Sequence, residues 1–212
     1  MLVKSKTLKE TVIKKLEKQA KYSFSASVVE YFALIEELEG SEITVEFNTN
    51  EIITYMSQAT EKHELMVGNL VGNFYIQLLK KGYEEYRVYG SNRPVYAIEC
   101  QKGFNADVLV VKGETELYPR DKQVAATLNP RIVIEILSKS NEGVGFVEKI
   151  SCYKKIESLK QILLVNQYKP SISSYIRISE NEWLNHEYNR LDENIKIEDF
   201  TISASDIYRN VF

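Results

Sequence analysis

Hydrophobic residues recur at helical spacing in several segments of the chain. From Thr7 to Ala20 they lie among lysines and glutamates, which predicts an amphipathic helix. The same spacing returns over about 27–38, where Gly40 follows as a stop signal, and over about 60–80. A further helical stretch is expected between residues 140 and 156.

Strand patterns occupy the segments between these helices. Residues 42–47 and 51–56 flank Asn48-Thr49-Asn50, which predicts a hairpin because Asn tolerates left-handed backbone. The β-branched runs 106–111 and 131–137 are too short for helices and too apolar for half-exposed strands, so they should form the centre of the sheet. The remaining expected elements are strands over 84–89, 94–98, 161–165, 172–178 and 183–188, and a closing helix or turn over 203–211.

The composition is typical of a globular chain, since 44% of its 212 residues are hydrophobic and 27% are charged. This length suits one sheet with its covering helices. We therefore expect an α/β fold with an N-terminal helical extension over 1–25 and a single domain over 26–212. The net charge of −3 gives no global positive field, so any contact with nucleic acid must come from a local patch.

The N-terminal residues lack the apolar segment of a signal peptide, and no stretch approaches the ~20 apolar residues of a membrane span. The chain has two cysteines, Cys100 and Cys152, without metal-binding spacing or the density of a secreted scaffold. We expect both to be reduced thiols and the protein to be cytoplasmic.

Glu135 is the most informative polar residue, because it interrupts the apolar strand from Ile132 to Leu137. Alternation places it on the face of Val133 and Leu137. A carboxylate buried there is costly unless it is paired, protonated or bound to a cation. A structural salt bridge with a lysine is the alternative to a functional role.

Asp107 stands before Val108-Leu109-Val110-Val111, at the end of the neighbouring apolar strand. Alone it is more typical of a turn. Together with Glu135 it predicts a divalent cation site, because Mg²⁺ takes one or two carboxylates with water and phosphate oxygens. Lys149 and Tyr153 lie one turn apart on the following helix, and a lysine directed at such a site stabilises charge that develops on a phosphate. The alternative for Lys149 is a solvated surface lysine.

From about Tyr31 to Arg177 these residues resemble the Uma-two type restriction endonuclease family, within the PD-(D/E)XK nuclease superfamily. The resemblance is carried by several motifs together: Val45-Glu46-Phe47 with Glu51-Ile52-Ile53, His63, Ser91-Asn92-Arg93-Pro94-Val95, the Asp107 strand, Pro130 to Ser138, Glu148-Lys149 with Tyr153, and 159–165 with Gln167 and Pro170.

The resemblance implies a restriction-endonuclease-like core, a mixed central sheet flanked by helices. It implies that Asp107 and Glu135 ligate Mg²⁺ or Mn²⁺, and that Glu46 is an additional acidic residue. Leu137 stands where the superfamily pattern has a lysine, so the resemblance assigns that role to Lys149.

Other motif residues are assigned to the substrate or depart from the family pattern. His63, Tyr153 and Arg93 are expected to bind the substrate, although a structural or surface role is the favoured alternative for His63. Three positions depart from the relatives: Ala106 replaces a proline, Gly145 replaces a common aspartate, and Thr49-Asn50 replaces an Asn-Gly turn.

The leading functional hypothesis is metal-dependent hydrolysis of DNA phosphodiester bonds. The alternative is a nuclease fold that binds nucleic acid or a protein without cutting, which Gly145 and the acidic balance favour. A small-molecule-binding domain has no phosphate loop or dinucleotide fingerprint in its support. Homodimerisation is compatible with cutting two strands, but the sequence does not show it.

Overall fold

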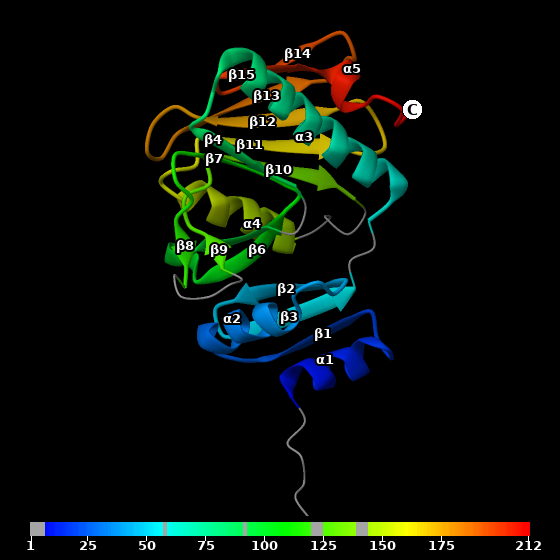
Figure 1. Cartoon of the computed structure of the whole chain (residues 1–212), viewed down its shortest axis with the longest axis vertical. Coiled ribbons are helices and arrows are strands. Elements are labelled where there is room, and N and C mark those ends of the chain that lie inside the picture. The colour runs from blue at the N-terminus through cyan, green and yellow to red at the C-terminus, as the bar shows by residue number, and fades with distance from the viewer. Residues whose placement is uncertain (1–6, 57–58, 91–92, 120–124, 139–143) are drawn as a thin grey trace, which may run out of the picture.

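The computed structural model describes residues 7–56, 59–90, 93–119, 125–138 and 144–212. Two β-sheets dominate the fold, and helices cover their outer faces and part of the space between them (Figure 1). The helices are α1 (Leu8–Leu16), α2 (Val28–Glu37), α3 (Glu61–Lys81), α4 (Val144–Lys155) and α5 (Ala204–Ile207), with a 3-10 turn η1 (Ile98–Cys100).

The sheet nearest the C-terminus has six strands in the order β13-β12-β11-β10-β7-β4. Its central strands β10 and β11 are parallel, whereas β10 and β7 are antiparallel, so the sheet is mixed. The strands are β4 (Tyr86–Tyr89), β7 (Val108–Lys112), β10 (Ile132–Leu137), β11 (Gln161–Asn166), β12 (Ile172–Arg177) and β13 (Trp183–Tyr188).

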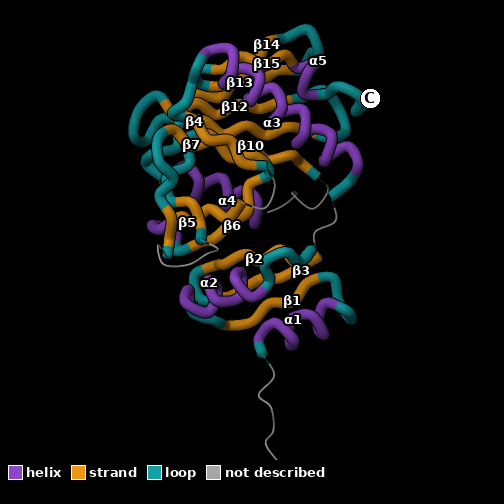
Figure 2. Tube along the Cα trace, in the orientation of Figure 1, coloured by secondary structure: helices purple, strands orange, loops and turns teal. Residues whose placement is uncertain are grey.

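The other large sheet has seven strands in the order β1-β3-β2-β6-β5-β9-β8. A separate hairpin of β14 and β15 lies beside α3 at the far end of the molecule (Figure 2). The strands are β1 (Lys21–Ser25), β2 (Ile43–Asn48), β3 (Glu51–Met56), β5 (Arg93–Ala97), β6 (Lys102–Ala106), β8 (Leu117–Tyr118), β9 (Ala126–Thr127), β14 (Asn194–Ile197) and β15 (Phe200–Ser203).

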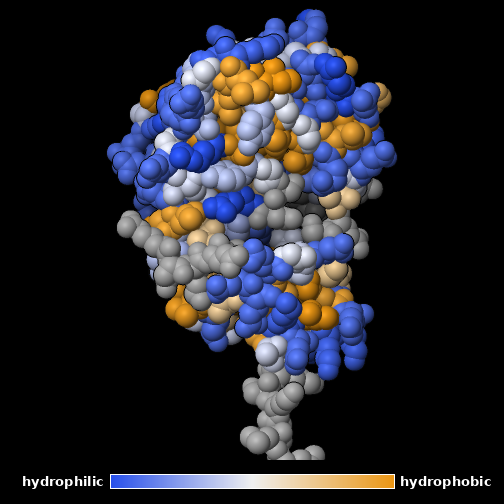
Figure 3. All heavy atoms as spheres, viewed as in Figure 1, coloured by the Kyte–Doolittle hydropathy of each residue, from blue (hydrophilic) through white to orange (hydrophobic). Residues whose placement is uncertain are grey.

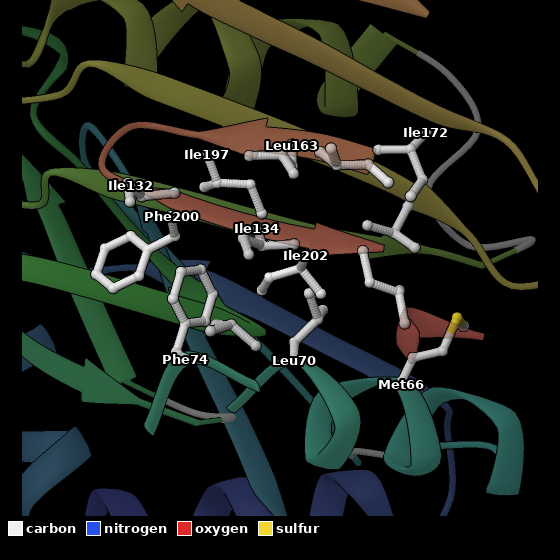
Figure 4. Close-up of a cluster of buried hydrophobic side chains, with 14 of the residues drawn as sticks. Met66, Leu70, Phe74, Ile132, Ile134, Leu163, Ile172, Ile197, Phe200 and Ile202 are labelled. Atoms are coloured by element: carbon white, nitrogen blue, oxygen red, sulfur yellow. The ribbon is translucent and has the colours of Figure 1, made fainter. Parts of the chain in front are cut away.

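One face of the six-stranded sheet is buried under α3 and the β14–β15 hairpin. Met66, Leu70 and Phe74 of α3 pack toward Ile132 and Ile134 of β10 (Figure 4). Helix α3 carries these side chains at i, i+4 and i+8, the spacing that puts them on one face. This packing fixes the N-terminus of α3 beside the edge of the sheet where β10 and β11 end.

The opposite face of the same sheet is covered by α4 and by strands of the second sheet. Leu109 and Val133 from the sheet and Tyr153 from α4 belong to one buried cluster with Val95 and Phe104 of β5 and β6. A third cluster packs α1 and α2 against β2 and β3. Helix α4 therefore lies between the two sheets, where its side chains can reach residues of both.

The predicted mixed α/β architecture is confirmed, including the two central strands, the hairpin over 42–56 and the helices over 27–38 and 60–80. The run expected as one strand from Ala106 is divided, because β6 ends at Ala106 and β7 begins at Val108. Asp107 thus occupies the junction between the two sheets.

One expectation about the elements was wrong, and one element was missed. Residues 21–25, placed in a helical extension, form strand β1, which pairs with β3 while Tyr22 and Phe24 pack on the third cluster. The β14–β15 hairpin was not expected, although its alternating burial is the ordinary signature of a half-buried strand pair. The division into an extension and a domain stays a prediction.

The two cysteines are not free thiols, as was expected, but form a disulfide between Cys100 of η1 and Cys152 of α4. The expectation failed because 52 residues separate them in sequence, whereas the fold packs η1 against α4. Among the described residues, no helix is long and apolar enough to cross a membrane.

Reduction of the disulfide is expected to lower the free energy of unfolding. The cross-link closes a loop of 52 residues, for which the chain-entropy model gives about 4 kcal/mol. Urea unfolding with and without a dithiol reductant measures the change, and a Cys100→Ser/Cys152→Ser double variant should not respond to the reductant. Two native thiols that titrate without added reductant would contradict the cross-link.

A second prediction concerns Gly103 of β6, which leaves room for the ring of Tyr31. A Cβ at position 103 would lie 2.5 Å from the Tyr31 hydroxyl, and that hydroxyl is buried and has no hydrogen-bond partner among the described residues. Gly103→Ala should therefore destabilise the protein by about 1–3 kcal/mol. The cost should shrink in part in a Tyr31→Phe background, because the hydroxyl overlap is removed while ring carbons at 2.7 and 2.9 Å remain. Urea unfolding of all four proteins measures the difference, and an equal cost in both backgrounds would rule out the overlap with the hydroxyl.

Candidate active site

The pairing of β7 with β10 brings Asp107 and Glu135 together. Val108 lies opposite Ile134 in this antiparallel pair, so one further step of the register places Asp107 opposite Glu135. The backbone N–H of Ile136 donates to Asp107 Oδ2 over 2.7 Å and closes this end of the ladder. Opposite residues of antiparallel strands share a face. The two carboxylates therefore meet on the face that α4 covers.

Glu135 is held by two side chains from α4. Its Oε2 lies 2.9 Å from Lys149 Nζ, and its Oε1 accepts a 2.9 Å hydrogen bond from the Tyr153 hydroxyl. Lys149 Nζ also donates to the carbonyl oxygen of Asn105 over 3.1 Å. Glu135 is only 2% exposed and Tyr153 is completely buried. Lys149 and Tyr153, which lie one helical turn apart as expected, therefore both contact the carboxylate of Glu135.

Burial and charge act in opposite directions on this pair. Burial raises the pKa of Glu135 to about 7, which the ammonium of Lys149 opposes and the nearby charge of Asp107 reinforces. Burial alone would lower the pKa of Lys149, but the charges of Glu135 and Glu46 outweigh it and the pKa is raised. Lys149 accordingly stays an ammonium group at neutral pH, directed at a site with excess negative charge.

His63 connects α3 to Asp107. Its Nε2 lies 3.1 Å from Asp107 Oδ1, and its Nδ1 lies 3.2 Å from Glu64 Oε1. Burial alone would lower the pKa of His63, but its hydrogen bond and charge interaction with Asp107 prevail and raise it. The helix begins here because the Thr60 side chain caps it by accepting from the His63 N–H. His63 is therefore not a solvated surface histidine.

These side chains line a cleft of about 870 Å³ between the two sheets. Figure 3 shows the surface hollowed between the part that carries α3 and the part that carries β2 and β3. On the far wall, Glu46 of β2 accepts a 3.2 Å hydrogen bond from the Tyr55 hydroxyl. Lys21 and Lys102 add positive charge to the lining.

The donor set suits a hard divalent cation. Asp107 and Glu135 supply carboxylate oxygens to one cleft, and their mutual repulsion contributes to the raised pKa of Glu135, which a bound cation would relieve. The described part of the chain contains no cluster of three His, Cys, Asp or Glu side chains arranged for a metal. Mg²⁺ does not need one, because water and phosphate oxygens complete its coordination.

Comparison with known proteins gives a family match over most of the chain. Residues 28–205, most of the chain, match the Uma2 family, described as "Putative restriction endonuclease". The chain belongs to the Uma2 family. It is 28% identical over 153 residues to the uncharacterized protein sll1609 of Synechocystis sp., covering 72% of this chain and 82% of that protein.

A solved structure has the same fold as this Uma2 protein. A protein from Anabaena variabilis ATCC 29413, described as "a putative nuclease belonging to DUF820", superposes with a TM-score of 0.62 at 15% identity, over 86% of this chain and 99% of that one. The predicted resemblance to the Uma2 family and the restriction-endonuclease-like fold are confirmed.

The structure brings most of the expected Uma2 site residues into the cleft. Its lining includes Asp107, Glu135, Lys149, Glu46 and His63. Two residues that were expected to bind the substrate lie elsewhere. Tyr153 is completely buried behind Glu135. Arg93 bonds to Thr127 Oγ1 and stacks on Tyr89, outside the cleft lining.

The structure shows the environment of two positions that depart from the Uma2 pattern, Gly145 and Leu137. Gly145 lines the cleft, and a Cβ there would meet none of the described residues within 4 Å. Leu137 is partly buried and packs against the cluster under α4. Ser91 and Asn92 of the expected motif lie outside the described residues.

Sequence reasoning missed several contacts that support the site. Asn105 offers a backbone carbonyl to Lys149, and Tyr55 bonds to Glu46. Thr60 and Gln167 bond to each other over 2.6 Å although 107 residues separate them. The Thr60 cap before a helical run was a usable signal. No local sequence pattern predicts the contact between Thr60 and Gln167.

Loss of Lys149 should destabilise the protein, because it would leave Glu135 buried without its counter-charge. Lys149→Met is expected to cost about 3–5 kcal/mol, the range for breaking a buried ion pair. A Glu135→Gln/Lys149→Met variant removes both charges and should regain part of that loss. Urea unfolding at pH 8 measures both. Equal stability of wild type and Lys149→Met would show that the pair is not formed.

Proposed function

We propose that this Uma2 protein is a Mg²⁺- or Mn²⁺-dependent nuclease that hydrolyses DNA phosphodiester bonds in the cleft between the two sheets. The observation that supports this most strongly is the antiparallel register that sets Asp107 against Glu135, with the partly buried ammonium of Lys149 at 2.9 Å from Glu135. Paired carboxylates beside a fixed lysine are suited to binding a metal ion and a phosphate together.

Asp107 and Glu135 are the residues that would hold the metal. When bound, the ion supplies polarisation of the phosphate and a lowered pKa of its water. The protein supplies orientation: the Ile136 N–H fixes one oxygen of Asp107, and the Tyr153 hydroxyl fixes one oxygen of Glu135. In this proposal Tyr153 is a positioning residue and does not touch the substrate.

Lys149 is the group that we assign to the negative charge that develops on the phosphate. Its ammonium is anchored by the Asn105 carbonyl and by Glu135, so its position is set before the substrate arrives. A donor held in place in this way loses little energy to reorganisation during the reaction. Glu46 is the additional acidic residue, and its contact with Tyr55 places it on the opposite wall.

The remaining positive charge of the cleft is suited to the nucleic-acid backbone. Lys21 and Lys102 both belong to the cleft lining, but Lys102 is paired with Glu148. Lys21 and Lys149 are therefore the lysines that we assign to the phosphates of the backbone. We further propose a homodimer, in which two clefts would serve the two strands of a duplex. A cytoplasmic location stays a proposal from the sequence, and the Cys100–Cys152 disulfide does not support it, because disulfides are typical of oxidising compartments.

A second candidate function is binding without cleavage. Gly145 leaves open space where relatives commonly have an aspartate, and Glu135 is already compensated by Lys149. A protein that kept the fold and lost the metal could still bind nucleic acid through the cleft lysines. Metal binding discriminates this function from the first.

Asp107→Asn should abolish both metal binding and DNA cleavage. Loss of a group that only supports a metal ligand typically lowers metal affinity roughly 10–100-fold. Loss of a ligand itself should lower the affinity for Mn²⁺ at least as much. Calorimetric titration with Mn²⁺ and cleavage of plasmid DNA measure the two effects. Glu85→Gln, a change at an exposed carboxylate outside the cleft, is the matched control and should behave as wild type. Unchanged cleavage by Asp107→Asn would refute the proposal, and wild-type DNA binding without Mn²⁺ affinity would establish the second function.

A further inference from the structure

Gln167 lies on the floor of the cleft without an assigned role. It follows β11 directly, and extending the parallel register of β10 and β11 by one step sets it beside Ser138. Both residues line the cleft, together with Asp107 and His63. Gln167 is only 1% exposed, so its amide is enclosed by the protein on nearly every side.

The amide of Gln167 is satisfied at one end only. Its Oε1 accepts a 2.6 Å hydrogen bond from Thr60 Oγ1, whereas its Nε2 has no hydrogen-bond partner in the described structure. Thr60 Oγ1 accepts the N–H of His63, so its own proton is available to the Gln167 oxygen. This arrangement leaves the nitrogen as the free end. An unpaired buried donor is costly, and a ligand that supplies an acceptor removes the cost.

The surroundings of the free amide favour an anionic acceptor. Thr60 is the N-cap of α3, a helix of 21 residues, and the first N–H groups of a helix have no partner within it. The positive end of the helix dipole reinforces these donors. Of the acidic side chains around this turn, Asp107 and Glu64 are both engaged with His63, and Glu61 is exposed to solvent.

We propose that the Gln167 amide and the first turn of α3 bind a nonbridging oxygen of a phosphate that flanks the scissile phosphodiester of the DNA strand. This inference rests on the proposed function, because it places the second phosphate next to the site at Asp107. A cation is excluded as the ligand, since the free amide end carries only donors. Reading adenine would require both ends of the amide, and the oxygen is already bound to Thr60.

The first test uses the wild-type protein and inorganic phosphate as the probe. In a ¹⁵N-labelled sample the side-chain amide signal of Gln167, assigned by its absence in Gln167→Leu, should shift on titration with phosphate. It should shift in the same direction with a short single-stranded DNA. A signal that stays in place with both probes, while other cleft residues respond to the DNA, overturns the proposal.

The second test compares two Gln→Leu variants. Gln167→Leu should bind single-stranded DNA about tenfold more weakly in fluorescence anisotropy, the loss expected for one hydrogen bond to a charged group. Gln77→Leu removes a glutamine that bonds to Thr201 away from the cleft, and should leave DNA affinity unchanged. Equal affinities of wild type and Gln167→Leu overturn the proposal.

Both readouts are independent of cleavage. If the protein does not cut DNA but the Gln167 signal shifts and the affinity of Gln167→Leu falls, the proposed nuclease activity fails while the phosphate subsite stands. If it cuts DNA and neither readout responds, the subsite fails alone. For an active enzyme, Gln167→Leu should raise KM and leave kcat unchanged, because the contact forms equally in the ground state and the transition state.

Discussion

The site depends on a buried carboxylate that the fold must compensate. Glu135 is buried in β10, where every other residue is apolar. Its negative charge is unfavourable there unless a partner is held nearby. Helix α4 supplies two partners from consecutive turns, Lys149 and Tyr153. The Cys100–Cys152 disulfide links the same helix to η1, the turn between β5 and β6 of the other sheet. The position of α4 between the sheets thus serves both stability and chemistry.

The arrangement of charge follows from the same constraint. Asp107 stands where one sheet passes into the other, and the antiparallel register sets it against Glu135. One acidic group is paired with an ammonium and the other with an imidazole, so the cleft carries opposed charges in fixed positions. In the proposed function a divalent cation would bind the two carboxylates and a phosphate would bind the ammonium of Lys149.

Much of this could be predicted from the sequence, because the decisive signals are local. The apolar strand around Glu135 and the spacing of Lys149 and Tyr153 each follow from periodicity, and the structure brings them together. The resemblance to the Uma2 family added Glu46, which the structure places on the opposite wall of the cleft. Arg93 was expected in the cleft, but it stacks on Tyr89 because its strand lies beyond β6 in the sheet order.

What the sequence did not reveal depends on contacts between distant segments. Neither the disulfide nor the bond between Thr60 and Gln167 has a local signature, since each joins segments at least 52 residues apart. The strand at 21–25 was missed because its pairing with β3 outweighs the weak pattern of five residues.

The central claim, that Asp107 and Glu135 together hold a metal ion, is tested most directly by anomalous diffraction from crystals soaked in Mn²⁺. The account predicts one strong peak between the two carboxylates, at the roughly 2.0–2.6 Å from their oxygens that is usual for hard cations. Crystals at saturating Mn²⁺ with no peak there, and with Lys149 still the sole cation at Glu135, would contradict it.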